Sequence, residues 1–171
     1  ALVMVEATAV SPVGRISPAD SGMWSARHSQ AFEPIAAFMK KQGAVPGIQL
    51  AHAGRKASTD APWRGDKPLG ASGGGWKPIA PSPISFDKDY PTPREMSRED
   101  IEQTLSEFIS AAELSLAAGF EVLEIHMAHG YLLHEFLSPL SNHRTDEFGG
   151  SQDNRMRFPL QVASALRKIW P

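Results

Sequence analysis

Short apolar runs alternate with amphipathic segments along this chain. The runs Leu2–Val5, Val45–Ala51 and Phe120–His126 predict three strands, and their apolar character is typical of strands buried on both faces of a parallel sheet. Segments with apolar residues at helical spacing lie between these strands and after the last one. Strands that alternate with helices predict an α/β fold with parallel strands and right-handed crossovers.

Three helices are expected. The first covers about Ala26–Gln42, with Ser25 as its N-cap and Pro34 within it. The second starts at Ser97, and the third follows Ser151–Asn154. Each carries an apolar face, which a helix of a globular protein packs against a core.

A stretch rich in proline and glycine, about residues 57–93, separates the second strand from the second helix. Loops of this length in compact domains are usually functional or disordered. No Gly-x-Gly-x-x-Gly follows the first strand, and polar residues cluster after strand ends, where barrel active sites lie. We therefore expect residues 1–171 to form a single domain that is part of a TIM (β/α)₈ barrel. Three strands are fewer than eight, so we expect the chain to be a fragment.

Composition narrows the classes of partner. The formal net charge is −2 and 21% of residues are charged, a balance that gives no reason to expect nucleic acid or an anionic membrane as a partner. No apolar run approaches the roughly 20 residues of a membrane helix. The chain has no cysteine, which excludes disulfides and thiolate metal sites within it and fits the cytoplasmic location that we expect.

The most informative motif is Glu124–Tyr131, which follows the third strand. It places His126 and His129 three residues apart, and Tyr131 comes after a glycine. Two imidazole N–H groups can hold a carbonyl or nitro oxygen and stabilise negative charge that develops on it. A tyrosine hydroxyl, with an ordinary pKa of about 10, can act as a general acid. These three residues are the predicted catalytic and substrate-binding group.

The same motif allows two other interpretations. A histidine at a strand end can simply bond a backbone carbonyl. Alternatively, His126, His129 and His134 with Glu124 or Glu135 supply enough donors for zinc or iron, as in a metal-dependent barrel hydrolase. The spacing is not His-Glu-x-x-His and His134 falls on an expected new helix, so we expect no metal and rank the hydrolase second.

A second motif, Gly47–Lys56, contains a glutamine within an apolar strand. The amide of Gln49 needs a partner at both ends, and the edge of a planar heterocycle such as a flavin would provide them. A neighbouring strand or a water molecule would also do so. His52, Arg55 and Lys56 could orient an anion or brace the following loop.

The polar segment Ser138–Arg155 is predicted to have a structural role. Its side chains suit bonds to backbone groups and ion pairs, such as Arg144 with Asp146. We interpret the segment as a loop fixed by side-chain hydrogen bonds and followed by a helix cap. Substitutions in it should therefore disturb folding more than catalysis.

Four motifs in order resemble the Old Yellow Enzyme family, and most closely its bacterial branch of xenobiotic reductases and thermophilic-like ene-reductases. They are Val5–Val10, Gly47–Lys56, His126–Tyr131 and Ser138–Phe158. The resemblance covers essentially the whole chain and corresponds to barrel strands two to four.

The resemblance implies a (β/α)₈ barrel that binds FMN without a covalent bond and is reduced by NADPH or NADH. Reduced flavin would then pass a hydride from N5 to the β-carbon of an activated alkene, such as an enone, a nitroalkene or a xenobiotic. Ala7 and Gln49 would contact the flavin, with His126 close to it. His126 and His129 would hold the substrate oxygen, and Tyr131 would protonate the α-carbon.

The resemblance also implies flavin contacts outside these residues. A cysteine and a tyrosine would come from the preceding strand, and an arginine and phosphate-binding loops from later ones. We therefore expect residues 1–171 alone to be inactive and to bind FMN weakly or not at all, which flavin fluorescence quenching would test. A barrel piece acting only as an assembly module is the non-enzymatic alternative. The physiological substrate, the choice between NADPH and NADH, and whether the full-length protein is a homo-oligomer stay open.

Overall fold

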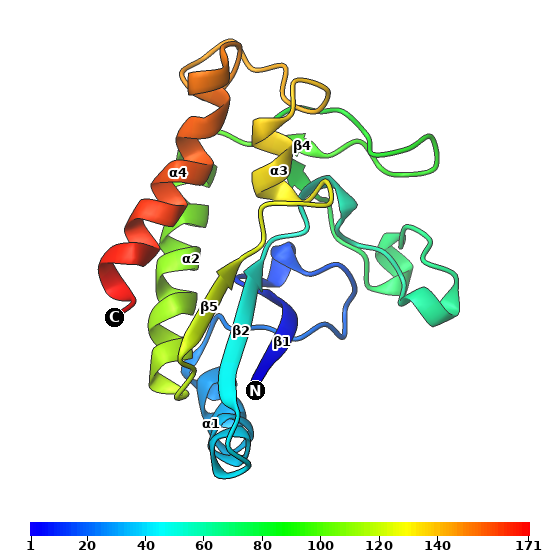
Figure 1. The fold of residues 1–171 in the computed structure, drawn as a ribbon. Helices are drawn as coiled ribbons and strands as arrows, with labels where there is room; N and C mark the ends of the chain where they lie inside the picture. Colours follow the sequence, from blue (N-terminus) through cyan, green and yellow to red (C-terminus); the bar gives the residue numbers. More distant parts are fainter.

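Three parallel strands form the sheet of the molecule. The computed structural model describes residues 1–171. The strands are β1 (Leu2–Ala9), β2 (Val45–Ala51) and β5 (Val122–Ile125), and they lie in the order β1-β2-β5 (Figure 1). Both strand pairs are parallel. The predicted α/β fold with parallel strands is confirmed.

Four helices accompany the sheet, namely α1 (Ala26–Lys41), α2 (Arg98–Ala117), α3 (Leu132–Leu137) and α4 (Gln152–Ile169). A helix connects each strand of the sheet to the next along the chain, as parallel strands require. The helix α1 continues through Pro34, and α2 and α4 run side by side along one face of the sheet (Figure 1). None of the helices combines the length and the apolar character needed to cross a membrane.

The helix starts follow different local chemistry. The hydroxyl of Ser97 accepts the backbone N–H of Asp100, and the Asp100 carboxylate accepts the N–H of Ser97, which completes a capping box. The hydroxyl of Ser151 likewise accepts a backbone N–H in the first turn of α4. Ser25 is the N-cap residue of α1, as predicted, but its hydroxyl makes no cap hydrogen bond and lies 2.9 Å from Nδ1 of His28.

A core of 19 buried residues joins the sheet to the helices. Ile48 and Leu50 of β2 are fully buried, as are Phe108 of α2, Phe136 of α3 and Phe158 of α4. The rings of Phe136 and Phe158 pack with their centroids 4.9 Å apart. This packing ties the short helix α3, which follows the histidine motif, to the long helix α4.

The two edge strands are less buried than their composition suggested. Leu2 and Val3 of β1 are 55% and 41% exposed, and no residue of β5 is fully buried. Each of these strands pairs with β2 on one side only, so one side of each lacks a neighbouring strand. The prediction of burial on both faces therefore fails for β1 and β5 and holds for most of β2.

The long loop at residues 57–93 is ordered around short elements. It contains the 3₁₀ turns Pro62–Arg64 and Ala71–Gly73 and the two-residue strand β3 (Ile79–Ala80). β3 pairs in parallel with β4 (Arg94–Glu95), just before α2. The loop extends to one side of the molecule, at the carboxyl end of the sheet (Figure 1).

Candidate functional site

The predicted chemical residues meet in a pocket beside the sheet. Residues from β1, β2, β5 and the segment after β5 surround about 460 Å³ of space. Strands contribute alternate residues to one face, which is why positions two apart on β1 both reach this pocket. The lining residues are Met4, Glu6, Ala7, Gln49, Glu124, His126, His129 and Tyr131.

The structure brings the two histidines and the tyrosine together. Nδ1 of His129 lies 3.3 Å from Nε2 of His126. The His126 ring packs edge-on against Tyr131, with the ring centroids 4.8 Å apart. The segment achieves this because His129 (φ 57°) and Gly130 (φ 75°) both adopt the left-handed conformation, which folds the chain back towards the strand end.

The surroundings set the protonation of these groups. Burial, followed by the neighbouring His129, lowers the pKa of His126, so its ring is neutral at pH 7. The backbone N–H of Ala128 donates to Nδ1 of His126 (3.3 Å), and the ring proton therefore belongs on Nε2, next to His129. Burial, followed by the charges of Asp20 and Asp66, raises the pKa of Tyr131. The phenol keeps its proton at neutral pH and can donate it.

Gln49 bridges all three strands. Its Oε1 accepts the backbone N–H of Ala7 at 3.0 Å, and its Nε2 donates to Oε1 of Glu124 at 2.8 Å. Ala7 has a φ of 38°, at the register shift between β1 and β2. Within this chain the amide is thus satisfied by neighbouring strands, one of the alternatives that the sequence left open.

The same three groups have the chemistry to receive a flavin. Gln49 is only partly buried and lines the pocket together with Ala7 and Glu124. It offers a donor and an acceptor side by side, and the Glu124 carboxylate adds a further acceptor. The edge of a flat ring that alternates donors and acceptors can form hydrogen bonds to these residues in place of the bonds that they make with one another. The residues present therefore fit FMN.

The ligand set of the hydrolase alternative does not assemble. Nδ1 of His134 accepts the backbone N–H of Gly130 at 2.8 Å, and Oε1 of Glu135 accepts the N–H of Arg55 at 2.9 Å. These two side chains are therefore committed to the backbone. No three histidine or carboxylate side chains in the chain lie close enough together to hold a metal ion.

His52 and Arg55, which follow β2, do not line the pocket. His52 is buried, its Nδ1 accepts the N–H of Gly54 at 3.1 Å, and burial lowers its pKa to about 4. Arg55 donates to the carbonyls of Ile84 and Ser85 in the long loop. Arg55 therefore braces the long loop, which is one of the two roles considered for His52, Arg55 and Lys56.

Sequence reasoning did not single out Met4 and Glu6, and it considered Glu124 only as a possible metal ligand. The alternation of side chains along β1 was a usable signal for the first two, because Met4 and Glu6 are two positions apart. Glu124 lies opposite Gln49 only through the register between β2 and β5, which pairs residues 75 positions apart. Nothing local in the sequence specifies that register.

Glu135 yields a prediction for stability. Its carboxyl is buried, Oε2 has no hydrogen-bond partner, and burial raises its pKa from 4.5 to about 8. The folded state therefore binds this proton more tightly than the unfolded chain, and stability falls as the pH rises from about 5 to about 8. We expect Glu135→Gln to stabilise the full-length protein by an amount on the order of 3 kcal/mol at pH 8, because glutamine keeps the acceptor for Arg55 without a charge.

Urea unfolding at several pH values measures this effect. The gain from Glu135→Gln should shrink as the pH falls towards 5. Glu113→Gln, which changes an exposed glutamate of α2, serves as the control and should follow the wild-type profile. An equal gain from Glu135→Gln at pH 5 and pH 8 would show that the carboxyl is not protonated in the fold.

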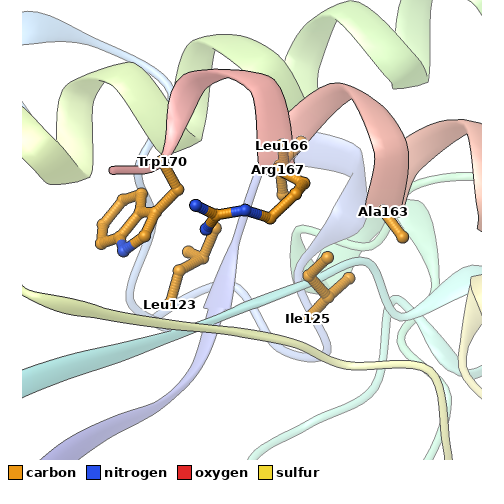
Figure 2. Close-up of a pocket in the computed structure, with 6 residues that line it drawn as sticks. All are labelled: Leu123, Ile125, Ala163, Leu166, Arg167 and Trp170. Carbon is orange, nitrogen blue, oxygen red and sulfur yellow. The ribbon is translucent and has the colours of Figure 1, made fainter.

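A smaller apolar pocket lies away from this chemistry. Figure 2 shows it between β5, which contributes Leu123 and Ile125, and α4, which contributes Leu166 and Arg167. The ring of Trp170 closes one end, and its indole N–H donates to the Glu121 carbonyl. The space measures about 150 Å³ and holds no acid–base pair. It is a packing space between a helix and an edge strand.

Comparisons with known proteins agree on one family. Residues 1–169 match the model of the NADH:flavin oxidoreductase / NADH oxidase family. The chain is 50% identical over 169 residues to an NADPH dehydrogenase of Bacillus velezensis and 49% identical to that of Bacillus subtilis. Each match covers 99% of this chain and 46% of the relative. The chain thus spans about half the length of the curated relatives that it matches.

Solved structures agree in fold. A morphinone reductase in complex with tetrahydroNAD superposes with a TM-score of 0.86 at 27% identity, over 99% of this chain and 48% of that protein. The Old Yellow Enzyme homologue from Zymomonas mobilis gives a TM-score of 0.83 at 31% identity, over 98% of this chain and 46% of that protein.

Proposed function

Because the chain belongs to the NADH:flavin oxidoreductase / NADH oxidase family, the family of Old Yellow Enzyme, and has part of its TIM-barrel fold, we propose a function for the full-length protein. It is an FMN-dependent NAD(P)H oxidoreductase that reduces activated C=C bonds in small molecules such as enones and nitroalkenes. The observation that carries this proposal is the convergence of His126, His129 and Tyr131 in one pocket with Gln49. We also propose that residues 1–171 form a single partial barrel domain of that protein.

The flavin would be held at the sheet end of the pocket. Gln49 would bond the pyrimidine edge of the isoalloxazine, and the backbone of Ala7 would meet the ring. Bound FMN, once reduced by NADPH or NADH, supplies the hydride. His126 lines the same pocket as Gln49 and His129, so it would contact both the ring and the substrate.

The histidines and the tyrosine would act on the substrate. Donation from Nε2 of His126 and from the neighbouring His129 ring would polarise the carbonyl or nitro oxygen, which stabilises the charge that develops on it. Tyr131, protonated at neutral pH, would deliver its proton to the α-carbon. The ring centroids of His126 and Tyr131 are 4.8 Å apart, so one bound substrate could accept a hydrogen bond from the histidine and a proton from the tyrosine.

Purification of the full-length protein tests the proposal. The protein should carry FMN or take it up, and it should oxidise NADPH faster in the presence of 2-cyclohexenone, with cyclohexanone as the product. Parallel assays with NADH give the preferred reductant. A colourless protein that cannot be reconstituted with FMN, or one that contains stoichiometric zinc, would contradict the assignment.

A further inference from the structure

Lys56 connects the turn after β2 to the histidine segment after β5. It is the last residue of the 3₁₀ turn Gly54–Lys56, and its Nζ donates to the backbone carbonyl of His129 at 2.6 Å. The two residues are 73 positions apart in the chain. This is a charge-assisted hydrogen bond, which is stronger than a bond between neutral groups.

The bond acts at a strained point of the backbone. His129 is a non-glycine residue with a φ of 57°, and such a conformation persists only where the surroundings enforce it. The next residue, Gly130, is also left-handed, and a Cβ atom there would lie 3.2 Å from Cε and 3.3 Å from Nζ of Lys56. The lysine side chain therefore packs directly against the turn that orients the His129 ring.

The ammonium group is itself held in place. It lies 4.2 Å from the ring centroid of Phe86 and 5.6 Å from that of Tyr131, so two aromatic rings lie within reach of its charge. Its own turn is anchored because the neighbouring backbone N–H of Arg55 donates to Oε1 of the buried Glu135 carboxyl group. Burial and the charge of Arg55 lower the pKa of Lys56. A freely solvated surface lysine would have none of these contacts.

We propose that Lys56 is a positioning residue of the reaction. By holding the His129 carbonyl it fixes the left-handed turn, and so keeps the His129 imidazole next to His126 and Tyr131. The expected effect of Lys56 on the reaction rate rests on the proposed function, whereas its expected effect on the backbone of His129 does not. Lys56 acts through His129 and is not itself assigned a contact with the substrate.

The test compares Lys56→Met and Lys56→Arg in the full-length holoenzyme. Enzyme reduced with dithionite is mixed with 2-cyclohexenone, so NADPH plays no part. Because a charge-assisted hydrogen bond is lost, we expect Lys56→Met to lower the second-order rate constant for oxidation of the reduced enzyme by the enone roughly tenfold or more. Lys56→Arg keeps a cation and should recover most of the rate. Reoxidation by O₂, which needs no histidine, should not change in either variant.

Matched controls separate the possible outcomes. Lys40→Met removes a lysine that pairs with Glu121 at the opposite end of the strands, and should behave as wild type. If Lys56→Met loses its flavin, Phe86→Leu, which removes one of the rings beside the ammonium, is measured in the same way and should show a smaller slowing. Equal slowing of the enone and O₂ reactions, or no rescue by Lys56→Arg, would overturn the proposal.

A crystal structure of Lys56→Met provides the readout that is independent of activity. We expect His129 to leave the left-handed region and its ring to move away from His126. If the wild-type protein does not reduce enones, the proposed function fails while this structural expectation can still hold. If the wild type is active and His129 is unmoved in the variant, the inference about Lys56 fails alone.

Discussion

Replacing Tyr131 by phenylalanine is expected to slow alkene reduction by the full-length protein by at least about 100-fold, the lower end of what a general acid contributes. The substitution removes only the hydroxyl. The ring still packs against His126, so the imidazoles keep their support. Reduction of the flavin by NADPH needs no proton from this phenol, and its rate should stay close to that of the wild type.

Stopped-flow measurements separate the two half-reactions. Flavin absorbance is followed first with NADPH alone, and then with 2-cyclohexenone added to reduced enzyme. Tyr90→Phe is a matched control, because Tyr90 is the only other tyrosine in the chain and packs on Phe86 in the long loop. An equal loss in both half-reactions would contradict the role assigned to Tyr131.

Replacing Arg144 by methionine is expected to destabilise the fold by about 3 kcal/mol, because two backbone carbonyls lose their donor. The Arg144 side chain is only 7% exposed. Its Nη1 donates to the carbonyls of Met96 (2.6 Å) and Pro81 (3.1 Å), and the rest of the guanidinium pairs with Asp146. The arginine thus joins the segment before α4 to the segment before α2.

Urea unfolding of the full-length protein measures this loss. The control is Arg98→Met, because Arg98 is 61% exposed and its surface pairs with Glu102 and Glu147 are each worth less than about 1 kcal/mol. Folded Arg144→Met enzyme should retain its rate of enone reduction, since the guanidinium lies outside the pocket lining. A stable variant with lost activity would instead place Arg144 in the chemistry.

The sequence predicted the elements well because their signals are local. Helical spacing of apolar residues and the serines before α2 and α4 located those helices, although α4 begins within the segment Ser151–Asn154 and not after it. Ser25 shows the limit of such signals. The same residue type precedes α1, but a histidine three positions later takes its hydroxyl. A cap therefore depends on which competing partner is near, and residue type alone does not reveal it.

The site was predictable where it lay in one segment. His126, His129 and Tyr131 are close in the chain, so a single turn brings them together. The partners of Gln49 and Lys56 come from other strands, and only the register of the sheet determines them. The exposure of β1 was also unpredictable, because composition does not show whether a strand has one neighbour or two.

The bonds that Gln49 makes with Ala7 and Glu124 imply a resting arrangement for the site. Because these three residues are bonded to one another, their hydrogen-bonding groups are satisfied without water or another side chain when no ligand is bound. An incoming planar ligand would swap one set of hydrogen bonds for an equivalent set, at little net enthalpy. Affinity would then come chiefly from stacking and from contacts far from this edge, and reconstitution should be reversible.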